Sequence, residues 1–159
     1  MHTVRDLLLR KPPKIVMIDP RCTLLQTLLK MGEHGVGALL VADGEGNLLG
    51  IVTEHDFSKA AGKFGDTLLK RPVSDLMTPD LITCEINDSI VDALVMMSRG
   101  RIRHLPVTDR GEVVGLLSVR DLLALCIDAM RSDDSILRQQ LADATWAGEQ
   151  AGNDTWLSA

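Results

Sequence analysis

The chain has 159 residues, of which 45% are hydrophobic, 25% charged and only 3% aromatic, and its formal net charge is −5. These values predict one compact domain, or two very small ones, with a core of aliphatic side chains. The acidic balance argues against a nucleic-acid binder, and no apolar run has the length of a membrane span or a signal peptide. We therefore expect a cytoplasmic protein with neither nucleic acid nor membrane as a partner.

Most of the chain is written twice, at an offset of about 66 residues. The matching pairs are Val4–Leu8 with Val73–Met77, Lys14–Met31 with Asp80–Met97, and Ala38–Phe57 with His104–Leu122. Two copies are too few for a solenoid, so they predict a pair of equivalent units. We accordingly divide the chain into a first unit with an N-terminal segment (1–68), a second unit (69–130) and a C-terminal helical tail (131–159).

Taken in chain order, each unit is predicted to form strand, helix, strand, turn, strand and helix. The first unit has these at 14–18, 23–31, 38–42, 43–47, 48–53 and from 54 on; the second has them at 81–85, 89–97, 104–108, 109–112, 113–118 and from 119 on. Thr23 and Ser89 stand at N-cap positions of the first helices. The fold class is therefore α/β of the α+β type, with two βαββα units.

The tail after residue 131 predicts one more amphipathic helix. Ser132 or Asp133 can cap it, and apolar residues follow at helical spacing at Ile136, Leu137, Leu141 and Ala144. Such a helix either joins two chains or folds back on its own chain. Trp146 and Trp156 fit both alternatives.

The phrase "GIVTEHDF" returns as "GLLSVRDLL", so a hydroxyl precedes an acid by three residues in both units. As a capping box, Thr53 or Ser118 accepts from a backbone N–H, and Asp56 or Asp121 reaches back to the cap residue. As a ligand site, the same helix start binds phosphate while the acid accepts from ribose hydroxyls. An Asp56 carboxylate turned back on its own helix favours a silent site, and one facing the second unit's basic residues favours a bound ribose.

Basic residues accompany this motif in the second unit only. Arg103 and His104 stand at the start of a strand where the first unit has Gly37 and Ala38, and Arg120 lies inside the second motif. Their charge suits phosphate groups, although each is also an ordinary solvated surface residue.

Two units that each end in Gly-h-h-[Ser/Thr]-x-x-Asp, where h is hydrophobic, resemble a tandem pair of CBS domains, or Bateman module. The resemblance covers roughly Val4 to Met130. It implies two units of approximate twofold symmetry packed through their sheets, with two clefts between them. It further implies that each cleft takes an adenosine-containing regulatory ligand such as AMP, ADP, ATP or S-adenosylmethionine, with no required cofactor.

The resemblance also implies which residues line each cleft. The ribose acid and phosphate hydroxyl fall on Asp56 and Thr53 in one cleft and on Asp121 and Ser118 in the other. The remaining lining residues come from the opposite unit: Ile82, Ile102, Arg103 and His104 with Asp56, and Val16, Val36, Gly37 and Ala38 with Asp121. The basic pair favours a multiply charged phosphate tail beside Asp56. The Asp121 cleft relies on Arg120 and takes fewer phosphates or stays empty.

No nucleophile, base and orienting group are arranged as a catalytic set, so we expect no enzyme and no catalytic residues. The histidines and the cysteines Cys22, Cys84 and Cys126 lack metal-ligand spacing, so no metal or disulfide is expected. Two functions remain. One is a sensor that binds an adenosine ligand and regulates an unidentified protein. The other is a dimerisation or partner-interaction module with vestigial clefts; the resemblance implies a homodimer.

Overall fold

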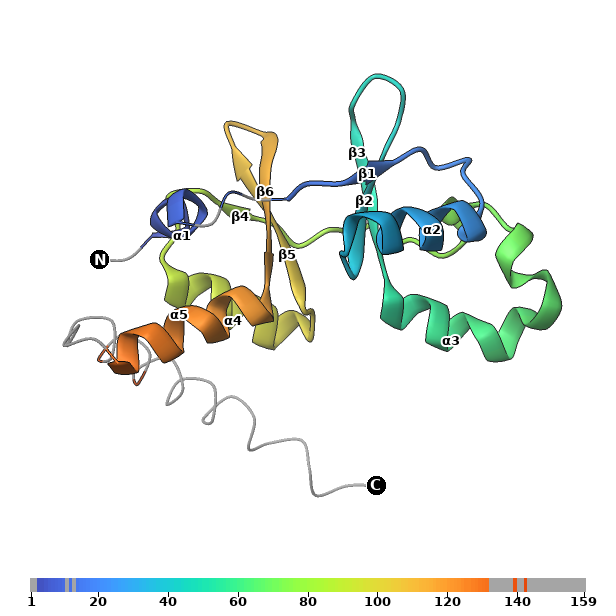
Figure 1. Ribbon diagram of the computed structural model, residues 1–159. Helices are drawn as coiled ribbons and strands as arrows, with labels where there is room; N and C mark the ends of the chain where they lie inside the picture. Colours follow the sequence, from blue (N-terminus) through green and yellow to red (C-terminus); the bar gives the residue numbers. More distant parts are fainter. Residues whose placement is uncertain (1–2, 11, 13, 132–138, 140–141, 143–159) are drawn as a thin grey trace. The chain divides into compact units, whose positions relative to one another are not determined.

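The computed structural model describes residues 3–10, 12, 14–131, 139 and 142 (Figure 1). The chain divides into two compact units. One is Lys14–Leu81, called the first unit below; the other, the second unit, joins Met1–Pro13 to Ile82–Ala159.

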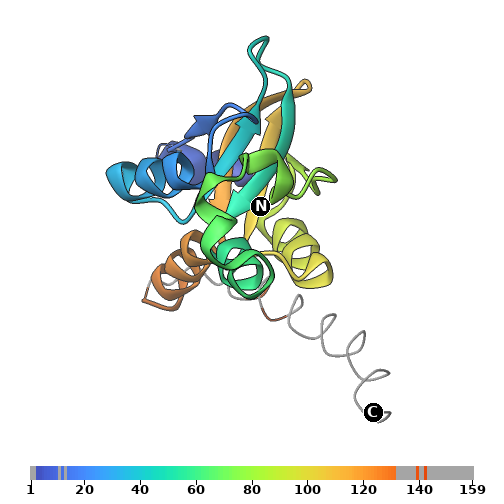
Figure 2. The same cartoon turned by 90° about the vertical axis from the view of Figure 1, so that its right-hand side faces the viewer.

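The first unit is a three-stranded sheet with helices. Its elements are β1 (Met17–Ile18), α2 (Leu24–His34), β2 (Ala38–Ala42), β3 (Leu48–Thr53), α3 (Glu54–Phe64) and the 3₁₀ segments η1 (Gly65–Lys70) and η2 (Val73–Asp75). The strand order is β1-β2-β3, with β1 parallel and β3 antiparallel to β2. The turn between β2 and β3 projects beyond the sheet in both views (Figures 1 and 2).

The second unit repeats this arrangement. Its elements are β4 (Cys84–Glu85), α4 (Ile90–Gly100), β5 (His104–Asp109), β6 (Glu112–Ser118) and α5 (Val119–Arg131), together with α1 (Val4–Arg10) from the start of the chain. The strand order β4-β5-β6 has the same parallel and antiparallel pairings as the first sheet. The predicted α/β class with two βαββα units is confirmed.

The repeated Val-x-Asp-Leu segments are exchanged between the units. Val4 N–H donates to Asp88 O at 3.0 Å in the second unit, and Val73 N–H donates to Cys22 O at 2.8 Å in the first. Val4 and Val73 are both fully buried. The segment around Val4 therefore completes the core of the second unit, and the segment around Val73 completes the core of the first.

This exchange changes the boundaries expected from the repeat. Residues 3–10 pack with the second unit, and residues 69–81 pack with the first. The physical reason is that Val4 and Leu7 fill the second core, while Val73 fills the first. The predicted helical tail lies outside the described residues except at 131, 139 and 142.

Local chemistry explains where the elements begin and end. Gln26 N–H donates to Thr23 Oγ1 at 3.2 Å and Asp92 N–H to Ser89 Oγ at 3.0 Å, so both predicted N-caps are confirmed. The strands predicted at 14–18 and 81–85 are shorter, with two residues each, because only Met17–Ile18 and Cys84–Glu85 pair with their parallel neighbours β2 and β5. The second hairpin turns through Arg110 and Gly111, both at positive φ.

Candidate functional site

In the first unit, the hydroxyl–acid motif forms a helix cap. Thr53 ends β3 and is the N-cap of α3. Its backbone N–H and its Oγ1–H both donate to Asp56 Oδ2, at 2.8 and 2.7 Å. The Asp56 carboxylate is therefore turned back on its own helix, which is the orientation that the sequence associates with a silent site.

The second motif has the same geometry. Ser118 ends β6, and its N–H and Oγ–H donate to Asp121 Oδ2 at 2.9 and 2.6 Å. Asp121 N–H returns a bond to Ser118 Oγ at 3.2 Å. The capping-box interpretation is confirmed for this motif, and each hydroxyl already donates its proton to the acid of its own motif.

The same pattern caps helices that lie outside the two motifs. Thr3 Oγ1–H donates to Asp6 Oδ2 at 3.0 Å at the start of α1, and Ser89 Oγ–H donates to Asp92 Oδ2 at 2.6 Å at the start of α4. The box by itself therefore has a structural role. An ionised carboxylate offers about four lone pairs on two oxygens, and both bonds that Thr53 donates to Asp56 end on Oδ2. Capping is thus compatible with a ligand bond to the other oxygen.

The glycine that opens each motif makes room for the exchanged segment. A Cβ at Gly50 would lie 2.7 Å from the backbone oxygen of Thr78. Thr78 forms an antiparallel bridge with Ile51, the residue after this glycine. A Cβ at Gly115 would lie 2.9 Å from Leu8 Cδ1 in the second unit. Close packing therefore accounts for the first residue of Gly-h-h-[Ser/Thr]-x-x-Asp.

The first unit brings two of its predicted lining residues, Gly37 and Ala38, to the start of α3. Ala38 pairs with Thr53 across the β2–β3 ladder, and Glu54 N–H donates to Gly37 O at 3.1 Å. Val16 is 7% exposed and belongs to the core, with Val36 packed against that core. Gly37 therefore lies next to the start of α3, and it has no side chain there.

The second unit does the same with the basic set. His104 pairs with Ser118, and Val119 N–H donates to Arg103 O at 3.0 Å. Arg103 is exposed and His104 is half-buried; Arg120, in the first turn of α5, is also exposed. Three basic residues, Arg103, His104 and Arg120, are therefore next to the Ser118–Asp121 motif in the backbone pairing or in the sequence.

Ile82 and Ile102 form an apolar edge in the second unit. Ile82 is 42% exposed, whereas its repeat equivalent Val16 is only 7% exposed. A Cβ at Gly100 would lie 2.6 Å from Ile82 Cδ1 and 3.5 Å from Ile102 Cγ1. Both isoleucine side chains thus lie close to Gly100 at the end of α4. The pairing of residues from opposite units around Asp56 and Asp121 stays a prediction.

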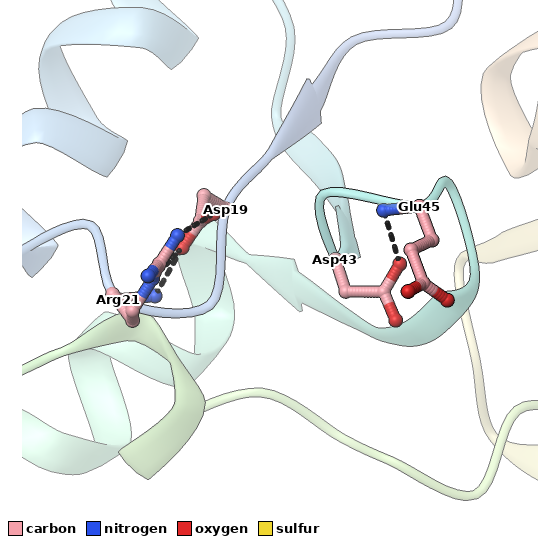
Figure 3. A network of polar contacts seen from close by, with 4 residues as sticks. All are labelled: Asp19, Arg21, Asp43 and Glu45. Atoms are coloured by element: carbon pink, nitrogen blue, oxygen red, sulfur yellow. Dashed lines mark hydrogen bonds and ion pairs between the residues drawn. The ribbon is translucent and has the colours of Figure 1, made fainter.

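A polar network that the sequence analysis missed lies at the other end of the first sheet (Figure 3). Asp19, just after β1, forms an ion pair with Arg21 at 2.9 Å. This pair lowers the pKa of Asp19 to about 2, chiefly through the side-chain hydrogen bond. Asp43 accepts from Glu45 N–H at 3.0 Å and from Asn47 N–H at 2.8 Å. In both turns, an aspartate directly after a strand accepts a hydrogen bond from the backbone N–H two residues later. An aspartate at that place in the sequence is the signal for such a turn.

Two other kinds of feature are absent from the part of the chain that the structure describes. Its helices include none long and apolar enough to cross a membrane. Its His, Cys, Asp and Glu side chains form no group of three or more able to hold a metal ion.

The two units have the same strand order and the same capping motif, and each contains one of the exchanged segments. The chain is therefore a tandem repeat of one α/β unit. The family model described as "CBS domain" matches residues 4–63 and 73–128. The chain belongs to the CBS-domain family.

Several relatives share most of their length with this chain. It is 31% identical over 125 residues to the CBS domain-containing protein YhcV of Bacillus subtilis (strain 168), covering 77% of this chain and 84% of that protein. The crystal structure of the CBS-domain containing protein ATU1752 from Agrobacterium tumefaciens matches with a TM-score of 0.75 and 34% identity, over 77% of this chain and 91% of that one. The CBS domain pair of protein MJ0100, solved with 5′-methylthioadenosine and S-adenosyl-L-methionine, matches with a TM-score of 0.68 and 26% identity, over 79% of this chain and 95% of that one.

Proposed function

We propose that this chain is a non-catalytic regulatory module that binds an adenosine-containing ligand through the starts of α3 and α5. The observation that carries the proposal is the adenosyl ligands bound to the CBS pair of MJ0100, which shares the fold over 79% of this chain. The chemistry of the chain supports it. Each helix start offers backbone N–H groups, and the two bonds that Thr53 donates to Asp56 both end on Oδ2.

The charge distribution favours a ligand with phosphate groups on the side of Arg103, His104 and Arg120. Arg103 and Arg120 are exposed, and guanidinium groups bind phosphate oxygens in pairs. The edge of Ile82 and Ile102 is apolar enough to contact a purine base. An adenine nucleotide and S-adenosylmethionine both contain the adenosine that these residues would recognise, and they differ in charge.

Calorimetry with AMP, ATP and S-adenosylmethionine tests the proposal on the wild type, Asp56→Ala, Asp121→Ala and Asp92→Ala. Asp92→Ala is the matched control, because Asp92 and Asp121 each accept a serine hydroxyl at 2.6 Å as helix caps. All three variants lose a cap. Asp56→Ala or Asp121→Ala should also weaken binding about 10- to 100-fold, because a charge-assisted hydrogen bond to ribose is lost. The proposal fails if millimolar ligand gives no heat, or if Asp92→Ala weakens binding as much as the motif variants do.

A second experiment identifies the ligand's charge. Arg103→Ala should reduce the affinity for ATP by about tenfold more than the affinity for AMP, because the two extra phosphates lose a cation. An equal loss for both nucleotides would place Arg103 away from the phosphates.

The second candidate function is a dimerisation or partner-interaction module without ligand. The orientation of both motif carboxylates favours it, since each acid is engaged by its own N-cap residue. Sedimentation velocity separates the candidates: a dimer whose mass and stability do not respond to any of the three ligands supports the module without ligand.

A further inference from the structure

Glu54 covers a position that has no side chain of its own. It is the first residue of α3, and its backbone N–H donates at 3.1 Å to the oxygen of Gly37, just before β2. The side chain of Glu54 turns to the same residue. A Cβ on Gly37 would lie 3.2 Å from Glu54 Oε2, 3.4 Å from Cδ and 3.8 Å from Oε1. The carboxylate group therefore lies in the space that a side chain at position 37 would enter.

The second unit reverses this arrangement of charge. Val119 is the first residue of α5, and its N–H donates at 3.0 Å to the oxygen of Arg103, just before β5. The Val119 side chain packs against the second core, whereas Arg103 is exposed. At equivalent places, the first unit thus presents a carboxylate over a glycine, and the second presents a guanidinium next to a valine.

The charge of the Glu54 carboxylate is not neutralised by an ion pair within the described residues. The side chain is exposed, and the ion pairs of this part of the chain join other residues. Glu54 and Asp56 both lie in the first turn of α3, whereas the first turn of α5 has one acid, Asp121, next to Arg120. Two carboxylates therefore already offset the positive end of the α3 dipole, and a further anion gains little there.

We propose that Glu54 determines ligand specificity: the adenosine ligand next to Gly37 carries no phosphate, and the ligand next to Arg103 carries phosphate. A carboxylate repels a phosphate placed beside it, whereas a guanidinium attracts one. Glu54 also offsets the charge of Arg120, which the sequence assigns to the same ligand as Gly37. The inference rests on the proposed function, since it concerns the tail of the ligand proposed there.

The ligand class that fits a carboxylate at this place is an adenosyl compound with a neutral or positively charged tail. The sulfonium group of S-adenosylmethionine is attracted to the Glu54 carboxylate, and the tail of adenosine is uncharged. AMP and ATP carry increasing negative charge and are disfavoured in that order. Next to Arg103 the order of the nucleotides is reversed, because the guanidinium gains with each added phosphate.

Calorimetry on the full chain with ATP and, separately, with S-adenosylmethionine tests this role of Glu54. Glu54→Gln removes the charge and keeps the shape. It should raise the affinity of the weaker ATP site at least about tenfold and lower that of the tighter S-adenosylmethionine site by a similar factor. Glu45→Gln is the matched control, because Glu45 is an exposed acid at the other end of the same sheet and the change in net charge is equal. It should change neither affinity.

The direction of the two shifts separates charge selection from a structural role. Loss of a merely structural contact at Glu54 would move both affinities in the same direction. Shifts in the same direction, no shift at all, or an equal effect of Glu45→Gln would overturn the inference and leave the proposed function intact. A wild type that gives no heat with either ligand would overturn both.

A double variant transfers the charge pattern of the second unit to the first. Gly37→Arg with Glu54→Val reproduces the pair Arg103 and Val119, and Gly37 has no positive φ, so its backbone accepts an arginine. This chain should bind roughly two ATP molecules with similar affinity, and S-adenosylmethionine at least about tenfold more weakly than the wild type does. A thermal melt without ligand checks its folding. A folded double variant that binds ATP as the wild type does would contradict the inference.

Discussion

The two units share a backbone plan and differ in what they leave exposed. Ala38 pairs with Thr53 in one sheet and His104 with Ser118 in the other, and both ladders shift register at the equivalent place. Yet α2 exposes three leucines, whereas the equivalent side chains of α4 are half-buried. The comparison teaches that caps, turns and ladder pairings maintain the repeat, while surface side chains have diverged.

The largest effect is expected when a buried valine of an exchanged segment is replaced, and this tests whether the two units unfold separately. Val4→Asp should destabilise the second unit by about 3 kcal/mol or more, because a charge would be buried without a partner. Hydrogen exchange should rise in residues 84–125 and less in residues 16–64. Val73→Asp should produce the reverse pattern. Equal loss of protection in both halves for either variant would show that the units unfold as one.

The motif glycines should respond unequally to the same substitution. Gly50→Ala should destabilise the protein by about 1–3 kcal/mol, because the new methyl meets the Thr78 backbone oxygen at 2.7 Å. Gly115→Ala should have a smaller effect, because the methyl meets the end of the flexible Leu8 side chain. Denaturant unfolding of both variants measures the difference. A larger loss for Gly115→Ala would contradict it.

The two motif caps should be equivalent. Thr53→Ala and Ser118→Ala should each reduce the free energy of unfolding by about 1 kcal/mol, because each removes the N-cap hydroxyl of a helix. Urea unfolding with an unchanged slope checks the values. A much larger loss at one cap would mean that its hydroxyl does more than cap its helix.

The buried thiol of the second unit should affect stability only at alkaline pH. Burial, with a contribution from Asp88, raises the pKa of Cys84 from 9.0 to about 11. A pKa raised on folding adds stability that is complete below pH 9 and lost as the pH rises through 11. The wild type should therefore lose more stability than Cys84→Ala in this range. Thermal melts compare the two, and parallel pH profiles would exclude this role for Cys84.

Much of the fold is predictable from local patterns. The repeat gives the order of elements, hydroxyls at Thr23 and Ser89 start helices, and glycine-rich segments mark the hairpin turns. These features depend on neighbouring residues, so short-range chemistry determines them. The Ser118–Asp121 cap is likewise visible as a spacing, because both partners lie in one helical turn.

The sequence by itself determined two copies of a βαββα unit and the motif that starts the last helix of each. Only the tertiary structure decided that Val4 completes the second core and Val73 the first. It also decided that Val16 is buried while Ile82 is exposed, and that both motif acids face their own caps. The reason is that packing partners far apart in the chain are chosen by shape and by apolar surface, and neither leaves a periodic signal in the sequence.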